Sequence, residues 1–264
     1  MINFDRKSSY GVNDLVEIVR ILREPGGCPW DREQDHHSIR RNFLEEAYEA
    51  VEAIDEEDPE HLREELGDVL LQVALHARME QEAGRFDLDG VADGICKKLI
   101  FRHPHVFGDV DVSGSDEVLE NWEVLKRKEK HQATAADSVD SVAKSLPGLW
   151  RAEKIQKKAA KAGFDWPDAT GALEKLDEET AELRQAMAED SNIEEELGDL
   201  LFAAVNVARF VKVDPEQALA RACDKFSRRF RAIEAAAAGQ GKALEEMTLA
   251  EMDRLWDQVK ADET

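Results

Sequence analysis

The chain has 264 residues, of which 35% are charged, and a formal net charge of −23. This length allows one large domain or two domains of about 130 residues. The negative charge disfavours general binding to nucleic acid, because the phosphate backbone would be repelled. The negative charge does not exclude a small anionic ligand that binds together with metal ions.

Cysteines and apolar runs indicate the cellular setting. Cys28, Cys96 and Cys223 lie far apart and form no CxxC pair, so neither a disulfide framework nor a zinc ribbon is indicated. The first residues lack the apolar stretch of a signal peptide. The longest apolar runs, such as 200–207, are too short and too polar to span a bilayer. We therefore expect a soluble, cytoplasmic protein without a membrane segment.

Apolar residues recur at helical spacing throughout the first half, and the alternation typical of strands is rare, so an all-α fold is expected. Residues 25–27 end the first predicted helix, and the segment 28–31 is predicted to be a loop. Pro104 breaks the helical pattern after the fourth helix. The helices of this half are predicted at 13–23, 38–55, 60–83, 89–101 and 115–130.

A weakly patterned segment, 131–143, separates the two halves and is rich in Ala, Ser, Thr and Asp. We take residues 131–145 as a linker between an N-terminal domain at 1–130 and a C-terminal domain at 146–264. In the second half, loops are predicted at 163–167 and 190–192. Helices are predicted there at 149–162, 169–189, 193–212, 215–238 and 248–260.

One acidic pattern occurs twice. In the first half, Glu45-Glu46-Ala47-Tyr48-Glu49 is followed by Glu65-Leu66-Gly67-Asp68; in the second, Glu178-Glu179-Thr180-Ala181-Glu182 is followed by Glu196-Leu197-Gly198-Asp199. Other positions align between the halves, with changes of spacing only at presumed loops. These pairs are Trp30 with Trp166, Cys96 with Cys223, Lys98 with Lys225, and Trp122 with Trp256. Two copies of one helical unit are the simplest explanation.

The spacing of the acids predicts a metal site. Glu179 and Glu182, like Glu196 and Asp199, are three residues apart, which places both members of a pair on roughly one side of a helix. Four carboxylates that converge across a helical hairpin suit a hard divalent cation such as Mg²⁺. We expect Glu179 and Glu196 to flank the apolar stripes of their helices and to meet at the rim of the helix pair, with Glu182 further round and Asp199 furthest from its stripe. The stripe on the helix of Glu179 comprises Leu173, Leu176, Thr180, Leu183 and Met187. Gly198, which costs about 1 kcal/mol mid-helix, suggests close approach of another backbone or a ligand.

A basic cluster in the second half suits an anionic ligand. Lys225, Arg228 and Arg229 share one helix face, and arginine pairs with phosphate oxygens bidentately. Trp256 could stack on a base. The alternatives are an acidic solvated helix face, an ion-pairing surface strip for the basic residues, and a core position for Trp256.

Other site types receive less support. His103-Pro104-His105 is more often structural than metal-binding, and all seven histidines lie in the first half. A ferritin-like di-iron site needs ExxH pairs, and the corresponding pairs here are ExxD. A glycine-rich phosphate loop and a GxSxG motif are both absent from the sequence.

Together these motifs resemble the MazG family, nucleoside triphosphate pyrophosphohydrolases of the all-α NTP pyrophosphatase superfamily. The resemblance covers nearly the whole chain and rests on EExxE followed by ELGD in both halves. Matching segments are Gly27-Cys28-Pro29-Trp30-Asp31, Arg102-His103-Pro104-His105-Val106-Phe107, Gly163-Phe164-Asp165-Trp166 and Lys225-Phe226-Ser227-Arg228-Arg229-Phe230.

The resemblance implies two tandem MazG-type helical bundle units, joined by a linker, and a homodimer. It also implies Mg²⁺-dependent hydrolysis of NTPs and dNTPs, with broad base tolerance and with Mn²⁺ as a possible substitute. The products would be the nucleoside monophosphate and pyrophosphate, formed by attack of metal-activated water at the α-phosphorus. House-cleaning of nucleotide pools and control of nucleotide-derived alarmones are both possible roles.

The resemblance also implies which residues form the site, from their positions in the matching motifs. The implied metal ligands are Glu179, Glu182, Glu196 and Asp199, with Glu46, Glu49, Glu65 and Asp68 as the N-terminal set. The implied catalytic residues are Glu178, Glu179, Glu182, Glu196 and Asp199, with Glu178 as a candidate to orient the water. The implied nucleotide-binding residues are Lys175, Glu178, Glu195, Lys225, Arg228, Arg229 and Trp256.

The two copies differ in the basic cluster, because Phe101 stands at the position of Arg228, although Lys98 and Arg102 remain. We hypothesise that the C-terminal copy performs most of the turnover. Two rival functions stay open: an acidic interaction or regulatory protein that keeps the fold without turnover, and a di-metal oxidase.

Overall fold

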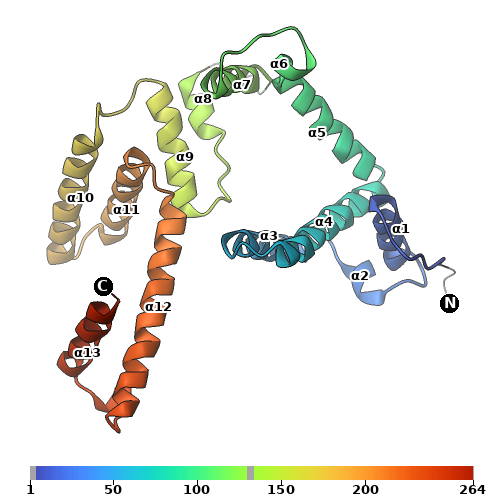
Figure 1. Cartoon of the computed structure of the whole chain (residues 1–264). Coiled ribbons are helices and arrows are strands. Elements are labelled where there is room, and N and C mark those ends of the chain that lie inside the picture. The colour runs from blue at the N-terminus through green and yellow to red at the C-terminus, as the bar shows by residue number, and fades with distance from the viewer. Residues whose placement is uncertain (1–3, 130–133, 264) are drawn as a thin grey trace. The chain divides into compact units, whose positions relative to one another are not determined.

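A computed structural model describes residues 4–129 and 134–263, and every regular element in these ranges is a helix. The chain forms two compact units, Met1–Lys126 and Arg127–Thr264, with the boundary inside one helix (Figure 1). The all-α prediction is confirmed. None of the described helices is long and apolar enough to cross a membrane.

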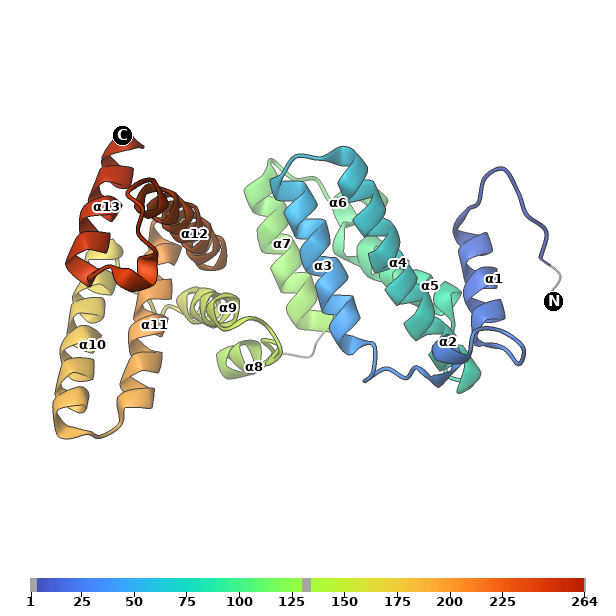
Figure 2. The same cartoon turned by 90° about the horizontal axis from the view of Figure 1, so that it is seen from below.

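The N-terminal unit is built on a helical hairpin, α3–α4, whose two helices run side by side (Figure 2). Helix α1 packs on α4, α2 packs on α1, and α5 leaves from the end of α4. The helices are α1 (Val12–Arg23), α2 (Pro29–Glu33), α3 (Arg40–Asp55), α4 (Pro59–Glu82), α5 (Leu88–Arg102), α6 (Pro104–Phe107) and α7 (Ser115–Glu129).

The turn between α3 and α4 is encoded locally. Glu57 adopts the left-handed conformation, with φ of 55°, and lets the chain reverse. The Asp58 carboxylate accepts hydrogen bonds from the backbone N–H groups of Glu60 and His61, and Pro59 occupies the first helical position. These features fix where α4 begins, and therefore set the register of its acids against those of α3.

The apolar core of this unit is small and lies toward the C-terminal half of α4. Val19 of α1 and Ile39 pack against Leu75 and Met79 of α4, together with Ala74. Each of these side chains is buried, and burial of a Val, Leu or Ile side chain contributes about 1.5–3 kcal/mol. This core attaches α1 to the end of α4 away from the α3–α4 turn.

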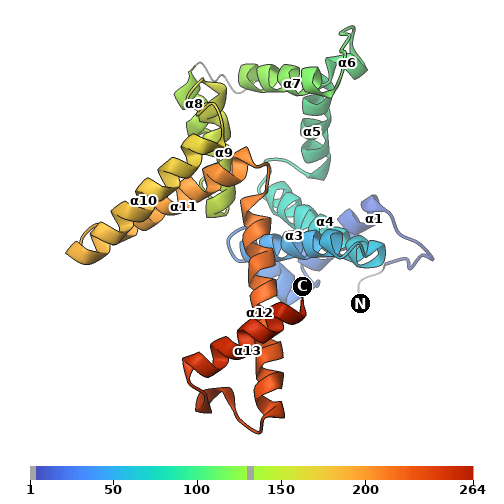
Figure 3. The ribbon, with the colours of Figure 1, turned by 60° about the vertical axis from the view of Figure 1, so that its left-hand side comes forward.

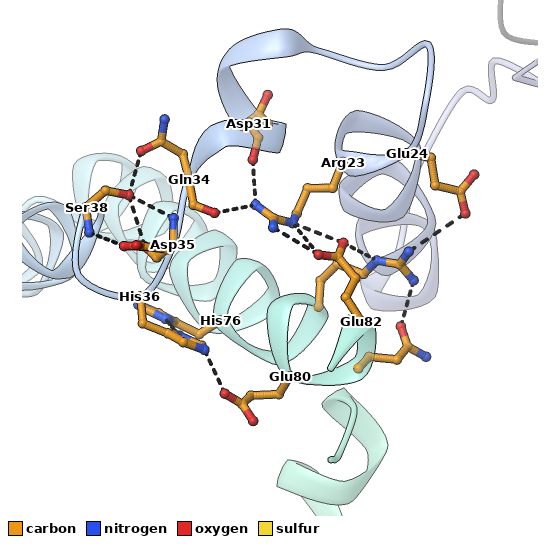
Figure 4. A network of polar contacts seen from close by, with 12 residues as sticks. Arg23, Glu24, Asp31, Gln34, Asp35, His36, Ser38, His76, Glu80 and Glu82 are labelled. Atoms are coloured by element: carbon orange, nitrogen blue, oxygen red, sulfur yellow. Dashed lines mark hydrogen bonds and ion pairs between the residues drawn. The ribbon is translucent and has the colours of Figure 1, made fainter. Parts of the chain in front are cut away.

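Polar contacts extend this attachment (Figure 4). The Arg23 side chain, only 7% exposed, pairs with Glu82 of α4 at 2.9 Å. Its guanidinium also donates to the backbone carbonyls of Asp31 and, at 3.1 Å, Gln34. One side chain thus joins α1, α2, the following loop and α4.

A pair of histidines continues the network. Nδ1 of His36 lies 2.7 Å from Nδ1 of His76, while the ring planes differ by only 4° and the ring centroids are 5.0 Å apart. These values place the rings edge to edge in nearly one plane, with a single shared proton between the two nitrogens. Nε2 of His36 donates to Glu80 at 2.7 Å, and Arg85 also pairs with Glu80.

The C-terminal unit contains a second hairpin, α10–α11, against which α9 packs through α11 (Figure 3). Helix α12 contacts α9 and forms another pair with α13. The helices are α8 (Ala135–Asp140), α9 (Gly148–Lys161), α10 (Ala169–Glu189), α11 (Ile193–Phe210), α12 (Pro215–Gly239) and α13 (Leu249–Asp262), with the 3₁₀ turn η1 (Leu244–Glu246) before α13.

Caps position these helices as well. Asp168 caps α10, and Asp214 caps α12 while also accepting a hydrogen bond from the Trp150 indole of α9 at 3.0 Å. Asp190 and Asn192 are both left-handed, with φ of 51°. The loop predicted at 190–192 is confirmed as a tight turn, in which the Asn192 side chain makes no capping hydrogen bond.

The apolar core of this unit lies between α12 and α13. Ile233 and Ala237 of α12 pack against Leu255 of α13, with Met247 before it, and Trp256 lies at the edge of the cluster. Because this core joins only α12 and α13, the α10–α11 hairpin is held mainly by its own contact and by α9.

The loop prediction at 28–31 was wrong, and the segment predicted to be a linker contains a helix. The segment 28–31, predicted to be a loop, begins the short helix α2 at Pro29, which suits the first helical position. The segment 131–145, predicted to be a linker, contains α8, which begins with a capping box of Thr134 and Asp137 and packs on α9. Residues 130–133, at the start of that segment, lie outside the described residues.

We predict that Glu80 contributes stability that acid removes. Hydrogen bonds from Arg85 and His36 lower the Glu80 pKa from 4.5 to about 2. A carboxyl with a depressed folded-state pKa stabilises the fold above its unfolded pKa, and that stabilisation is lost as the pH falls through the folded pKa. Wild type should therefore melt above Glu80→Gln at pH 7, and the difference should shrink between about pH 4.5 and pH 2.

Thermal unfolding followed by circular dichroism over this pH range measures the difference. Glu60→Gln is the matched control, because its partner Arg63 and Glu60 itself are both highly exposed. A constant difference between wild type and Glu80→Gln at all pH values would contradict the assignment.

Candidate metal and nucleotide site

An acidic residue lies in the packed face of the α10–α11 hairpin. The buried residues of α10 are Ala172, Glu179 and Ala186, and Glu179 is only 5% exposed. Small alanines above and below it let the helices approach closely. We expected Glu179 to flank an apolar stripe at the rim; instead the acid occupies the packed face, and Leu173 and Met187 of that stripe are exposed.

Three carboxylates meet at this position. One oxygen each from Glu179, Glu196 and Asp199 lies within 4.8 Å of the others. The predicted fourth ligand, Glu182, falls outside this tight group but is close to Glu179. Burial, and then the hydrogen bond and charge of Glu179, raise the pKa of Glu182.

Lys175 balances part of this charge. Its ammonium pairs with Glu179 at 2.5 Å and with Glu178 at 3.1 Å. These two hydrogen bonds raise the pKa of Lys175, so the lysine is fully charged at neutral pH. The structure thus places Lys175 and Glu178 beside the carboxylate group, whereas Glu195 is exposed on the first turn of α11.

The N-terminal hairpin carries a corresponding group. Oxygens of Glu46, Glu49 and Glu65 lie within 4.8 Å of one another. Burial, followed by the charge of Asp68, raises the pKa of Glu46. Here the buried acid is Glu65, on the second helix of the pair, whereas in the C-terminal unit it is Glu179, on the first.

His61 distinguishes the N-terminal group. Its ring lies 3.3 Å from Glu65 and 3.4 Å from Glu56. Burial of the ring lowers its pKa, but the hydrogen bond to Glu56 and the charge of Glu65 outweigh this effect, so the pKa is raised overall. In the second copy, the alignment that pairs Glu65 with Glu196 places Asn192 at this position.

Both groups fit a hard divalent cation. They offer only carboxylate oxygens at short mutual distance, which is the ligand type that Mg²⁺ and Mn²⁺ prefer. Burial raises the pKa values of Glu46 and Glu182, and the charges of neighbouring carboxylates raise them further; a bound cation would offset that charge repulsion.

A cavity of about 500 Å³ borders the C-terminal group, and Lys175, Glu179 and Asp199 lie in its wall. Aromatic rings from the 163–167 loop and α11 form much of the remainder, namely Phe164, Trp166 and Phe202. All three rings are exposed, with Phe164 at 84%. A polar ligand with one flat apolar part suits this combination.

The Trp166 ring is fixed from two sides. Arg209 of α11 pairs with Asp165, the neighbouring residue, and so holds the loop against α11. On α10, a Cβ atom at Gly171 would lie 2.2 Å from Cδ1 of Trp166, so only glycine leaves room for the indole.

The basic cluster lies on a different pair of helices, α12 and α13. The guanidinium of Arg229 lies 5.6 Å from the Trp256 ring centroid, and the Phe226 ring lies 5.3 Å from it. Arg228 and Lys225 are exposed on α12. Among the residues the structure describes, none of these five is hydrogen-bonded or ion-paired to the carboxylates of α10 and α11.

The N-terminal copy uses its basic residues differently. Arg102 is buried, and its guanidinium lies 5.0 Å from the Trp122 ring centroid. This contact parallels that of Arg229 with Trp256, but burial of Arg102 leaves less of it accessible to a ligand.

The sequence analysis assigned roles to Lys175, Glu179 and Asp199 of the cavity wall, but none to its aromatic residues. Phe164 and Trp166 belong to the matched motif Gly163-Phe164-Asp165-Trp166, which was the available signal. Asn206 and Arg209, which also line the cavity, belong to no motif and could not be found in this way.

A known protein family matches both acidic hairpins of this chain. The model of the MazG nucleotide pyrophosphohydrolase domain matches residues 34–107 and 169–233, which cover more than half of the chain and both acidic hairpins. The chain belongs to the MazG family. This confirms the family resemblance, and it supports the tandem arrangement, because the two matched segments contain α3–α4 and α10–α11.

Full-length relatives agree with this membership. A nucleoside triphosphate pyrophosphohydrolase of Escherichia coli K12 is 45% identical and aligns over 96% of this chain and 98% of its own length. The nucleoside triphosphate pyrophosphohydrolase/pyrophosphatase MazG of Thermotoga maritima is 43% identical over 95% and 96% of the two chains. The uncharacterized protein YabN of Bacillus subtilis is 50% identical over 93% of this chain and 51% of its own length.

We predict that the two acidic groups bind Mn²⁺ independently. Glu179→Gln should weaken binding at the C-terminal group by about tenfold or more, because it removes a buried charge from the ligand set. Glu65→Gln should do the same only at the N-terminal group. Calorimetric titration of the full chain with Mn²⁺ measures both effects.

The matched control is Glu189→Gln, at the exposed end of α10 away from the acidic group. Mn²⁺ affinity that is equal in wild type, Glu179→Gln and Glu65→Gln would contradict both sites.

Proposed function

We propose that the chain hydrolyses nucleoside triphosphates to the monophosphate and pyrophosphate with Mg²⁺, and that the C-terminal unit performs most of the turnover. The observation that carries this proposal is the carboxylate group of Glu179, Glu196 and Asp199 beside an aromatic-lined cavity. Family membership supports the same reaction class.

The first role of the acids would be to bind metal ions. Glu179, Glu196 and Asp199 would hold the cations, with Glu182 as a further ligand. When bound, the cations neutralise the triphosphate and polarise the α-phosphorus. In the reaction, an oxygen of water bonds to the α-phosphorus while the bond from that phosphorus to the bridging oxygen breaks, and pyrophosphate leaves. Glu178, exposed beside Lys175, would accept the proton of the water.

Besides compensating the charge of the acids, Lys175 would contact the substrate. Its ammonium already lies among the acids and lines the cavity, so a phosphate oxygen that enters can exchange for the Glu178 contact. A lysine that is charged at neutral pH provides this contact without proton transfer.

The base would lie against the exposed rings of Trp166 and Phe164. Stacking on an aromatic ring is tolerant of base identity, since every base has a π-face, and this accounts for broad base tolerance. Trp256 remains a predicted second contact, which would require the α12–α13 pair to meet the nucleotide.

The N-terminal copy is proposed to bind metal without comparable turnover. Phe101 replaces Arg228, and Arg102 is buried against Trp122. Both differences reduce the positive charge available to a triphosphate.

We also propose that the chain forms a homodimer. Leu197 and Leu201 of α11 are 45% and 50% exposed, and Leu173 of α10 is 49% exposed, so apolar side chains of both hairpin helices are left uncovered. Among the described residues of its unit, a Cβ at Gly198, between the two leucines, would meet nothing within 4 Å. The close approach that Gly198 suggests therefore does not occur within this described part, and a second copy could supply it.

The activity is tested by pyrophosphate release from ATP, GTP, CTP and UTP, with and without Mg²⁺. Glu179→Gln and Asp199→Asn should each lower kcat by about a hundredfold or more, because each removes a metal ligand. Glu46→Gln should retain most of the turnover. In H₂¹⁸O, the label should enter the monophosphate, since attack is at the α-phosphorus.

Two results would contradict these assignments. Loss of turnover only in Glu46→Gln would place the reaction in the N-terminal unit. Absence of release from all four substrates, together with tight binding to a protein partner, would favour a regulatory protein that has kept only the fold.

The dimer is tested by sedimentation. Leu201→Asp should shift the chain toward the monomer mass, because a buried charge at the interface is costly. Leu249→Asp, at an exposed leucine of α13, is the matched control and should leave the mass unchanged. A wild-type chain that sediments as a monomer at micromolar concentration would refute the proposal.

A further inference from the structure

A single acid covers the basic cluster of α12. Glu263 directly follows α13, and one of its carboxylate oxygens accepts hydrogen bonds from Arg228 Nε at 3.2 Å and Nη2 at 3.1 Å. The other accepts from Arg229 Nε at 2.8 Å and pairs with Nη2 at 2.7 Å. One carboxylate therefore bridges two guanidinium groups.

This geometry resembles that of a bound phosphate. Guanidinium groups bind phosphate and carboxylate through the same parallel N–H···O contacts, so the two anions compete for the same donors. Hydrogen bonds from Arg229 and then Arg228 lower the pKa of Glu263, so its carboxylate is charged at neutral pH. Arg229 is also held against Trp256, which keeps the donors in place.

We propose that Glu263 occupies the position of a substrate phosphate on Arg228 and Arg229, and that a triphosphate must displace it to bind. The inference rests on the proposed function, together with the expectation from the family resemblance that Arg228 and Arg229 contact the nucleotide. Glu263 would act as an internal competitor that sets the affinity for substrate and takes no part in bond breaking.

The contact is suited to displacement. Arg228 is 65% exposed and Glu263 is 30% exposed, and ion pairs that water reaches contribute little to stability. A triphosphate carries several negative charges and can also meet the exposed Lys225, one turn earlier on the same face. Exchange of one carboxylate for a polyanion is therefore favourable once the ligand is present.

A second acid of α13 provides the comparison. Glu251 pairs with a single lysine, Lys242, at 2.8 Å, and neither residue belongs to the basic cluster. Glu251→Gln and Glu263→Gln make the same chemical change next to the same helix. Only Glu263→Gln frees the two arginines that are predicted to bind phosphate.

The experiment measures binding of inorganic triphosphate to the full chain by calorimetry, and KM and kcat for ATP. Glu263→Gln should tighten triphosphate binding and lower KM roughly two- to fivefold, the effect of removing an exposed ion pair. The kcat should stay unchanged. Glu251→Gln should match wild type in all three values.

Arg229→Ala distinguishes a failure of the Glu263 inference from a failure of the proposed phosphate contact. If Arg229→Ala weakens triphosphate binding while Glu263→Gln leaves it unchanged or weaker, Glu263 serves to attach α13 to α12, and this inference is overturned. If Arg229→Ala has no effect on triphosphate binding, the phosphate contact in the proposed function is itself misplaced. Tighter binding in Glu263→Gln with an unchanged melting temperature supports the competitor.

Discussion

The repulsion between carboxylates inside two closely packed helix pairs is the constraint on which this molecule depends. Glu179 and Glu65 are buried among other acids, where an ionised carboxylate is costly unless a partner compensates it. Lys175 supplies part of the compensation for Glu179, and His61 supplies part of it for Glu65. A divalent cation would complete it. Binding and folding are thus linked, because any ligand that prefers the folded state stabilises it.

The positions of the long helices could be predicted from the sequence, and so could the approach of acids across each hairpin, although Glu182 and Asp68 lie outside the two tight groups. Caps such as Asp58 and Asp214 have side chains that define helix starts, and they lie where local chemistry alone decides the structure. The repeated acids could be paired because a helix and a tight turn leave little freedom between Glu179 and Glu196.

Burial could not be predicted in the same way. We expected the leucines of α10 to define the packed face, but Ala172 and Ala186 do so and Leu173 is exposed. Hydrophobic periodicity identifies an apolar face without saying whether this chain or another covers it. The cavity beside Glu179 was missed for a related reason, since Asn206 and Arg209 reach it only through the packing of three helices. The basic cluster was expected at the nucleotide, and the structure shows it occupied by Glu263.

The fit of Trp166 against Gly171 limits how this loop can change over time. An indole ring and a Cβ atom would occupy the same space, so the residues at these two positions cannot vary independently. In the first half, Trp30 is 58% exposed and the position equivalent to Gly171 is Asp35. The halves are therefore no longer interchangeable: a second-half loop grafted onto the first half would arrive without the glycine that makes room for its tryptophan.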